Sequence, residues 1–426
     1  MHESYGSIRN SLTKRIARGR GGIDARLGKP GGRRTVLLSN ESTLFGIEPE
    51  GCMTPFFGIR RRSGEVVDAH WVPPFRLSAR ESKSAGLLGR IAGEFLCSPN
   101  FGPDCRVGGV SIPAHGWTSH EEWGLESLGL DDQGDQAYCE LALESPSDEM
   151  PLSWHRRVTV VKGQCAYYSL LTIRNRGDSP VPIGIGHHNT VGAPFLESGC
   201  RISLSADSFR VPPEGSEFDA TGRLAIGAEF GDLAAAPLRD GGLADIGLVP
   251  GLVGSTDFVS GAVPRKLSLG WSCVVNPRLA LAYLCFFPGA ASLPAGEIAL
   301  SFNDLWMQYG GRRFEPWAET EGGQDRTFCL GTENATGAFA NGLAYSLAHP
   351  ELLGLPTIVE IPAGGERRLC YGTAIVELER ALLREGVRDA GAEGSSIVLK
   401  GKKSYQRVAL EGDFARLRGS AGWPSL

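Results

Sequence analysis

The chain has 426 residues, 42% of them hydrophobic, and a formal net charge of −5 at neutral pH. These values predict a sizeable core and argue against a body that binds nucleic acid, while a mean hydropathy of −0.11 and the lack of a long apolar run argue against a membrane span. The 58 glycines and 26 prolines favour many short strands and tight turns over long helices.

The ten cysteines are scattered between Cys52 and Cys370. They form no Cys-x-x-Cys pair and no His/Cys ligand spacing, so we expect no zinc site, and nothing in the sequence calls for another cofactor. The N-terminus has no apolar signal-peptide region, which disfavours a secreted protein with disulfides. We therefore expect reduced, buried thiols in a cytoplasmic protein.

Residues 1–34 differ from the rest of the chain, because they hold nine Lys or Arg side chains and only two acids. Such a segment could be a basic arm that touches nucleic acid or an anionic surface. The acidic remainder favours the other interpretation, a solvated and flexible leader. We expect no nucleic-acid partner.

From Thr35 the pattern is that of strands separated by Asn, Gly and Pro turns. The clearest pair is predicted at residues 158–161 and 166–174, joined at Lys162-Gly163. No linker or repeat divides the body. We predict a mainly β fold with few helices, a single large antiparallel sandwich over residues 35–390, in which strands contribute alternate residues to the inner face.

One helix is predicted near the C-terminus, in the segment "IVELERALLREGV". Its apolar residues Ile375, Leu378, Leu382 and Leu383 have helical spacing, and Gly386 is suited to end it. Residues 391–426 are expected to add a strand and a loose tail.

The long loop at residues 93–123 is the first of three polar clusters that interrupt the strands. It carries Asn100, His115, Trp117, His120 and Trp123. Flat indole rings cover the C–H face of a sugar while His and Asn bind its hydroxyls, so this composition suits a carbohydrate. The alternative is a loop packed down by its own aromatic residues.

The second cluster is "GIGHHNTVGAPFLESGC", residues 184–200. Neighbouring side chains on a strand point to opposite faces, so at most one of His187 and His188 faces a given pocket. A histidine at a strand end can exchange a proton near neutral pH, although a lone histidine is more often structural.

The third cluster spans residues 304–339. We interpret most of its charged residues, including Arg312, as surface pairs. Glu333 differs, because it follows the apolar run "FCLG" and precedes a turn of small residues. Desolvation at the buried end of a strand raises a carboxyl pKa, which suits a general base.

In chain order, "HGW…W", "RVTV…LTIRNRGDSP", "HNTVGAPFL" and "LGTEN" resemble the galactose mutarotase-like superfamily, which includes the aldose 1-epimerases. The resemblance spans about residues 40–375 and implies a β-supersandwich with a sugar site in a cleft on one sheet. In that family a carboxylate removes the proton of the anomeric hydroxyl and a histidine protonates the ring oxygen. The ring opens, the carbonyl rotates and the other anomer closes.

The resemblance implies that Glu333, His188 and His115 are the catalytic residues. Glu333 matches the carboxylate, His188 matches the acid by its spacing to Gly192, and His115 in "AHGW" matches a second histidine that positions the sugar. His187 is then expected to point into the opposite layer. The expected substrate-binding residues are Arg90, Asn100, Trp117, Trp123, Asn189, Trp306 and Trp317.

Three departures from the family pattern bear on the substrate. Ser119 stands where hexose-phosphate relatives carry an arginine, so we expect an unphosphorylated sugar. An aromatic pair is missing after His188, and Asn334 replaces the usual proline. These changes leave open a carbohydrate-binding protein without catalysis, and a structural β-sandwich with a basic arm is a third hypothesis. The predicted partner is a small carbohydrate, with no membrane and with a homodimer left open.

Overall fold

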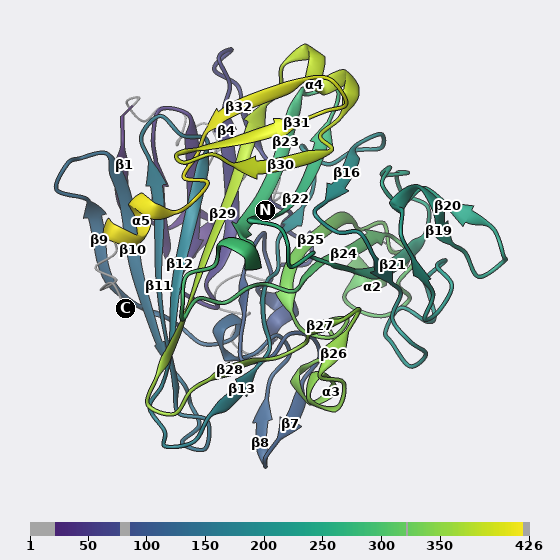
Figure 1. Ribbon diagram of the computed structural model, residues 1–426, viewed down its shortest axis with the longest axis horizontal. Coiled ribbons are helices and arrows are strands. Elements are labelled where there is room, and N and C mark those ends of the chain that lie inside the picture. Colours follow the sequence, from purple (N-terminus) through teal and green to yellow (C-terminus); the bar gives the residue numbers. More distant parts are fainter. Residues whose placement is uncertain (1–21, 77–85, 321–322, 421–426) are drawn as a thin grey trace.

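The computed structural model describes residues 22–76, 86–320 and 323–420. Strands dominate this part of the chain, and in its two large sheets all strand pairings are antiparallel. Helices are few and short. This architecture confirms the mainly β sandwich that the sequence predicted (Figure 1).

One large sheet, the central sheet, contains eight strands. The predicted strands at 158–161 and 166–174 lie in it as neighbours, with Val158 opposite Ser169. In spatial order its strands are β16 (Arg201–Leu204), β22 (Leu269–Asn276), β23 (Leu281–Pro288), β29 (Glu366–Glu377), β12 (Ala166–Asn175), β11 (Leu152–Val161), β10 (Gln136–Glu144) and β9 (Gly124–Leu130).

The second large sheet, the cavity sheet, has eight strands as well. In spatial order its main path is β18 (Glu229–Phe230), β17 (Phe209–Arg210), β21 (Ser255–Ala262), β24 (Phe302–Tyr309), β25 (Phe328–Thr336), β14 (Ile185–His187) and β6 (Leu96–Cys97). The short strand β15 (Thr190–Val191) also pairs with β25. The turn between β14 and β15 therefore lies directly beside β25.

The N-terminal part forms a five-stranded meander. Its strands are β1 (Asp24–Gly28), β2 (Thr35–Ser39), β3 (Thr43–Glu48), β4 (Met53–Arg60) and β5 (Val66–Asp68). Residues 1–21 of the predicted basic leader lie outside the described residues. The sandwich nevertheless begins before residue 35, because β1 pairs along its whole length with β2.

The predicted C-terminal helix is shorter than the pattern suggested. Ile375 lies in β29, where it pairs with Tyr283, and only α4 (Arg380–Glu385) is helical. Gly386 follows the helix at φ 76°, as expected for a helix end. The misassignment has a physical cause: β29 is buried on both faces, so the apolar residues at its C-terminal end do not alternate with polar ones and also match a helical spacing.

Residues 391–420 are an ordered part of the fold, which corrects the expectation of a strand with a loose tail. Strands β30 (Asp389–Ala392), β31 (Ser396–Lys400) and β32 (Tyr405–Ala409) form a small sheet, followed by α5 (Ala415–Ser420). Phe414 and Leu417 are buried against the outer face of the central sheet. Residues 421–426 lie outside the described residues.

The remaining elements are short. Two-stranded sheets pair β7 (Cys105–Val107) with β8 (Val110–Ile112), β13 (Val181–Ile183) with β28 (Val359–Ile361), β19 (Ala236–Pro237) with β20 (Leu243–Ala244), and β26 (Glu351–Leu352) with β27 (Leu355–Pro356). The other α-helices among the described residues are α2 (Trp317–Thr320) and α3 (Leu343–Ala348). Single 3-10 turns are η1 (Pro30–Gly32), η2 (Leu87–Gly89), η3 (Trp117–Ser119), η4 (Leu233–Ala235) and η5 (Ala290–Ser292).

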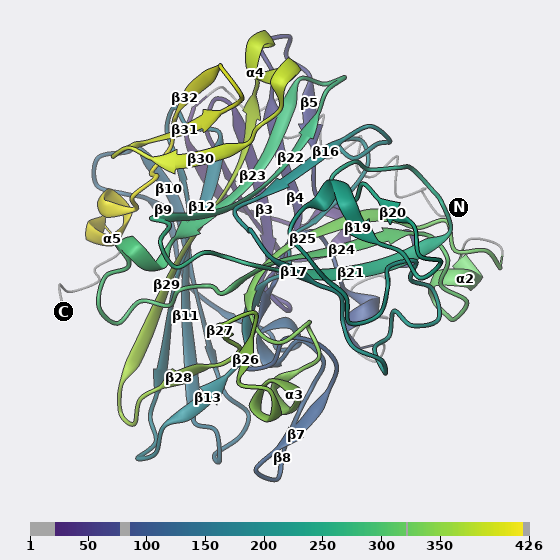
Figure 2. The same ribbon diagram turned by 45° about the vertical axis from the view of Figure 1, so that its right-hand side comes forward.

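The layers follow from which side chains each sheet buries. Tyr167 and Tyr283 of the central sheet pack with Leu305 and Met307 of the cavity sheet in the main core. On the other face of the central sheet, Tyr168 packs in a second core beneath the C-terminal strands. Figure 2 shows these strands and α5 on one side of the molecule and the cavity sheet on the other.

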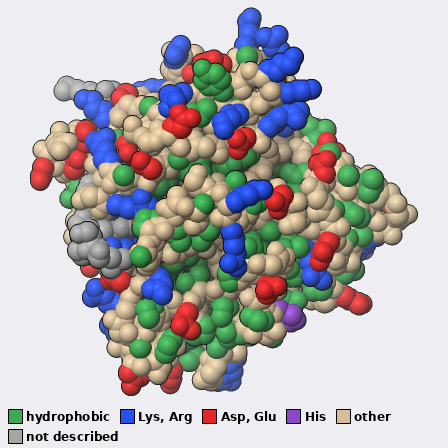
Figure 3. Space-filling view, viewed as in Figure 1, with side chains coloured by type: hydrophobic (Ala, Val, Ile, Leu, Met, Phe, Trp, Pro, Cys, Tyr) green, Lys and Arg blue, Asp and Glu red, His purple; other side chains and the backbone are tan. Residues whose placement is uncertain are grey.

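Several surface and chemical features can be stated for the described residues. All ten cysteines are free thiols, and only Cys105 and Cys165 are not fully buried. In the described ranges no helix has the length and apolar character to cross a bilayer, and no three His, Cys, Asp or Glu side chains are grouped to hold a metal ion. Figure 3 shows basic side chains gathered at the end formed by α4 and β30–β32.

Candidate active site

A cavity of about 770 Å³ opens on the face of the cavity sheet that is turned away from the main core. Side chains alternate along the strands here. Phe258 and Trp306 face the cavity, whereas Val259 and Leu305 point into the main core. Strands β21, β24 and β25 supply the floor, and the walls come from residues 87–91, 102–120, 215–218, 312–317 and 340–341.

Cross-strand pairing places Glu333 in the cavity floor. Ser260, Asp304 and Glu333 lie opposite one another on β21, β24 and β25. In the next row Gly331 lies opposite Trp306. A Cβ atom added at Gly331 would be 2.5 Å from Glu333 Oε1 and 2.9 Å from Trp306 Cβ. The glycine therefore leaves the space that the Glu333 carboxyl occupies.

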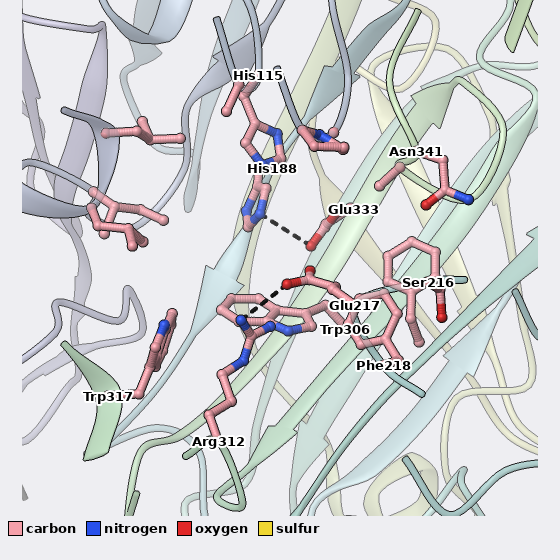
Figure 4. Close-up of a pocket in the computed structure, with 18 of the residues that line it drawn as sticks. His115, His188, Ser216, Glu217, Phe218, Trp306, Arg312, Trp317, Glu333 and Asn341 are labelled. Atoms are coloured by element: carbon pink, nitrogen blue, oxygen red, sulfur yellow. Dashed lines mark hydrogen bonds and ion pairs between the residues drawn. The ribbon is translucent and has the colours of Figure 1, made fainter. Parts of the chain in front are cut away.

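His188 follows β14 and faces the same cavity (Figure 4). Its Nε2 lies 3.3 Å from Glu333 Oε1, and its Nδ1 lies 3.1 Å from the Thr190 hydroxyl oxygen. The imidazole also stacks on Phe95, with ring centroids 4.5 Å apart and planes at 17°. The ring is thus held on three sides, with one nitrogen directed at the carboxyl group.

The neighbouring His187 points into the opposite layer, as strand alternation predicted. Its Nδ1 lies 2.8 Å from Glu94 Oε1, and its ring stacks on Tyr371 with centroids 3.8 Å apart. Glu94 also accepts a hydrogen bond from Arg156 Nη2 at 2.9 Å. Although burial opposes ionisation, Arg156 and His187 lower the pKa of Glu94 to about 2. These contacts give His187 a structural environment.

His115 reaches the cavity from the long loop through unusual backbone geometry. Its own φ is 59°, and the next residue, Gly116, has φ 77°. A Cβ atom at Gly116 would lie 2.1 Å from the Ser98 carbonyl oxygen, so only glycine fits there. The His115 ring packs edge-on against His188 with centroids 5.2 Å apart. Burial and the neighbouring His188 hold the pKa of His115 well below its usual value.

The contact between His188 and Glu333 joins two groups whose charged forms are disfavoured by burial. Desolvation raises the pKa of Glu333 well above its usual value, and the carboxyl groups of Asp304 and Glu217 raise it further. Desolvation lowers the pKa of His188 to about 4. Burial thus favours the uncharged form of both groups, in which the pair holds one proton, with one group able to give a proton and the other able to accept one.

Trp306 and Trp317, both predicted to bind substrate, line the cavity. Their ring planes are nearly perpendicular, at 82°, with centroids 6.0 Å apart. Both indole N–H groups are buried without a hydrogen-bond partner among the described residues. Buried indole N–H groups usually find a partner, so the two groups are suited to a ligand that accepts hydrogen bonds.

The sequence did not predict a binding role for Arg312, a charged residue that lines the cavity. Arg312, interpreted as part of a surface pair, has a side chain only 8% exposed, and its Nη1 lies 3.1 Å from Glu217 Oε2 (Figure 4). Its Nε donates to Gln308 Oε1 at 2.8 Å, and its guanidinium lies 4.7 Å from the Trp317 ring centroid. His120, which the sequence placed in the first polar cluster, also lines the cavity. Gly310 and Gly311, which follow β24 with φ values of 85° and 96°, were the available sequence signal for a turn just before Arg312.

Five predicted substrate-binding residues do not line the cavity. Trp117 and Trp123 are buried in the main core, and Asn100 donates to loop carbonyl groups at 2.7 and 3.1 Å. Arg90 donates to the backbone carbonyl of His120 in the long loop. Asn189 donates to the hydroxyl of the buried Tyr371 at 2.7 Å. The long loop is thus held by its own aromatic and amide side chains. This corrects their expected role as ligand contacts.

No family model matches the sequence, and no curated protein is similar to it at a significant level. Solved structures do resemble it. A candidate aldose 1-epimerase from Klebsiella pneumoniae superposes with a TM-score of 0.57 at 14% identity and covers 85% of both chains. A galactose mutarotase-like protein from Clostridium acetobutylicum has a TM-score of 0.57 at 11% identity, over 84% of this chain and all of that one (100%).

A third structure, a candidate aldose 1-epimerase from Escherichia coli K12, has a TM-score of 0.51 at 15% identity and covers 84% of this chain and 100% of its own. At sequence identities this low, the superpositions show a shared fold and no more. The extent of the superposition agrees with the sheets described above. The chain therefore has the galactose mutarotase-like fold.

Proposed function

We propose that this cavity binds an unphosphorylated aldose or aldose derivative and interconverts its anomers. The observation that carries the proposal is the 3.3 Å contact between His188 Nε2 and Glu333 Oε1 in the floor of a cavity with aromatic walls. Interconversion needs one acid and one base on the two oxygens of a hemiacetal, and this pair supplies both with a single proton.

In the proposed reaction Glu333, as carboxylate, takes the proton of the anomeric hydroxyl group while His188, as imidazolium, protonates the ring oxygen. The bond between C1 and the ring oxygen breaks, its electron pair goes to that oxygen, and C1 becomes a carbonyl. Rotation about C1–C2 and the reverse transfers close the other anomer. The empty pair reaches its starting state when one proton moves from Glu333 to His188 across their contact.

The remaining groups of the cavity fit the recognition of a sugar. Trp306 and Trp317 offer ring faces for the C–H surface and free indole N–H groups for hydroxyl oxygens. His115, whose ring edge rests on His188, is the candidate for positioning the substrate beside the pair.

Polarimetry with freshly dissolved α-glucose and α-galactose, then with other aldoses and uronic acids, tests the proposal. Wild type is compared with Glu333→Gln and with Glu229→Gln, a control on the exposed edge strand β18 of the same sheet. We expect accelerated mutarotation in wild type and in the control, and loss of the acceleration in Glu333→Gln. No acceleration with any sugar would refute catalysis.

A binding protein without catalysis is the second candidate, because the aromatic walls and the free indole groups serve binding alone. A thermal midpoint that rises with sugar, in wild type and in Glu333→Gln alike, would support it if the rate stays at the spontaneous value. A ligand that binds only the folded state must raise that midpoint.

A further inference from the structure

Asp304 is a buried carboxyl group on the face of β24 that carries Trp306, and the proposed reaction gives it no task. It lies on β24 with 0% exposure and is not part of the cavity wall. Neither of its carboxyl oxygens has a hydrogen-bond partner among the described residues. A buried polar group without a partner is costly, so its presence at this position needs an explanation.

The strand register gives the explanation. Asp304 lies directly opposite Glu333 on β25 and directly opposite Ser260 on β21. Opposed residues in an antiparallel sheet have Cβ atoms about 4.5–5.5 Å apart and project from the same face. The carboxyl groups of Asp304 and Glu333 are therefore neighbours in a dry environment. Two carboxylates at such a separation do not both ionise readily, and one of them keeps a proton.

We propose that Asp304 is a positioning residue for the proton of Glu333: protonated Asp304 donates a hydrogen bond to the Glu333 carboxylate whenever Glu333 has given up its own proton. The inference rests on the proposed function for its catalytic meaning. During the reaction Glu333, which is 1% exposed, must carry a negative charge without bulk water. Ser260, opposite Asp304, lowers the Asp304 pKa as a hydrogen-bond donor, which leaves the hydroxyl of protonated Asp304 able to donate. The proton stays on Asp304 throughout.

The surrounding charges are consistent with this assignment. Burial raises the pKa of Asp304 to about 8, so Asp304 is protonated at neutral pH and able to donate. Burial, followed by Asp304 itself, raises the pKa of Glu333 well above its usual value. The other titratable or charged groups that face Glu333 or interact with it are His188, His115, Cys97, Cys329, Glu217 and Arg312.

Infrared difference spectroscopy during a pH titration tests the pairing without any substrate, because protonated carboxyl groups absorb apart from carboxylates. The proteins are wild type, Asp304→Asn, Glu333→Gln and the control Asp257→Asn. Asp257 is buried on the neighbouring strand, but it accepts hydrogen bonds from the backbone N–H groups of Arg223 and Leu224.

We expect two protonated carboxyl bands in wild type and in the control at neutral pH, and one band in each of the other variants. In Asp304→Asn the remaining band should disappear at lower pH than the last band of wild type, because no second carboxylate forms beside Glu333. An unchanged titration of Glu333 in Asp304→Asn, or a wild type with fewer than two bands at neutral pH, would overturn the pairing.

Anomerisation rates then test the catalytic meaning. Asn keeps a hydrogen-bond donor, so we expect the rate of Asp304→Asn to stay near that of wild type. Leu has no donor, so we expect the rate of Asp304→Leu to fall about 10- to 100-fold, which corresponds to the loss of one hydrogen bond to a charged group. The alkaline limb of the pH profile should move to lower pH in Asp304→Asn. Equal rates in both variants would refute the donor role. If wild type turns over no sugar, the proposed function fails while the infrared result still decides the pairing.

Discussion

Replacing Asp304 by Asn should stabilise the protein, and increasingly so as the pH rises. The folded state holds the pKa of Asp304 at about 8, against 3.8 for an ordinary aspartate. When a carboxyl group has a higher pKa in the folded than in the unfolded state, its contribution to stability is fully present at pH values below the unfolded-state pKa. As the pH rises from about 4 to about 8, the unfolded chain ionises while the folded chain does not, so stability falls over this window. Above pH 8 both states are ionised and the loss is complete.

Each pH unit inside this window is equivalent to about 1.4 kcal/mol, so the difference between Asp304→Asn and wild type should reach roughly 4 kcal/mol at pH 7. Between pH 5 and pH 7 it should widen by roughly 3 kcal/mol. Urea unfolding at pH 5, 6 and 7 measures this directly. Asp257→Asn, which removes accepted hydrogen bonds, should destabilise the protein at all three values. A stability difference for Asp304→Asn that stays constant with pH would refute the reasoning.

Three further outcomes follow from the geometry of the cavity. The anomerisation rate should fall below about pH 4, because protonation of His188 then leaves the His188–Glu333 pair with two protons. It should fall again in the alkaline range, where Glu333 loses its proton and the pair has none. An acid limb near pH 6.5 in the pH–rate profile would contradict the lowered pKa of His188. Gly331→Ala should greatly reduce the rate, because the added Cβ displaces the Glu333 carboxyl group. In the control Gly391→Ala the added Cβ has no other atom within 4 Å, so the rate should be unchanged. Equal rates in the two variants would count against the placement of Glu333. Trp306→Phe and Trp317→Phe should each weaken sugar binding about 2- to 10-fold, because each variant loses a hydrogen-bond donor in the cavity. Calorimetry measures the affinity. The control Trp117→Phe changes a core residue outside the cavity and should retain wild-type affinity.

The sequence predicted the sheets better than the boundaries of the body. Residues 158–161 and 166–174 show a strand pattern with a turn between them, and they pair as predicted. The C-terminal part of β29 was taken for a helix because both of its faces are buried, so its residues do not alternate between apolar and polar as in a half-exposed strand. The packing of residues 396–420 against the central sheet depends on contacts with distant strands, which local pattern does not reveal.

For the candidate site, alternation along one strand separated His188 from His187, and the structure places the two rings on opposite sides as expected. Asp304 gave no local signal, because its neighbour Glu333 lies 29 positions later in the chain and the two meet only through strand register. The aromatic residues of the long loop had two interpretations. Trp117 and Trp123 turned out to serve the core, and composition alone could not separate that use from ligand contact.

The most direct test of the central claim is exchange spectroscopy by proton NMR, which measures the interconversion of the two anomers of galactose or glucose at equilibrium. His188→Gln is compared with wild type and with His187→Gln, the adjacent histidine in the opposite layer, and circular dichroism verifies that each variant is folded. The account predicts fast exchange in wild type and in His187→Gln, and exchange at the spontaneous rate in His188→Gln. Fast exchange that survives in His188→Gln but is lost in a folded His187→Gln would contradict it.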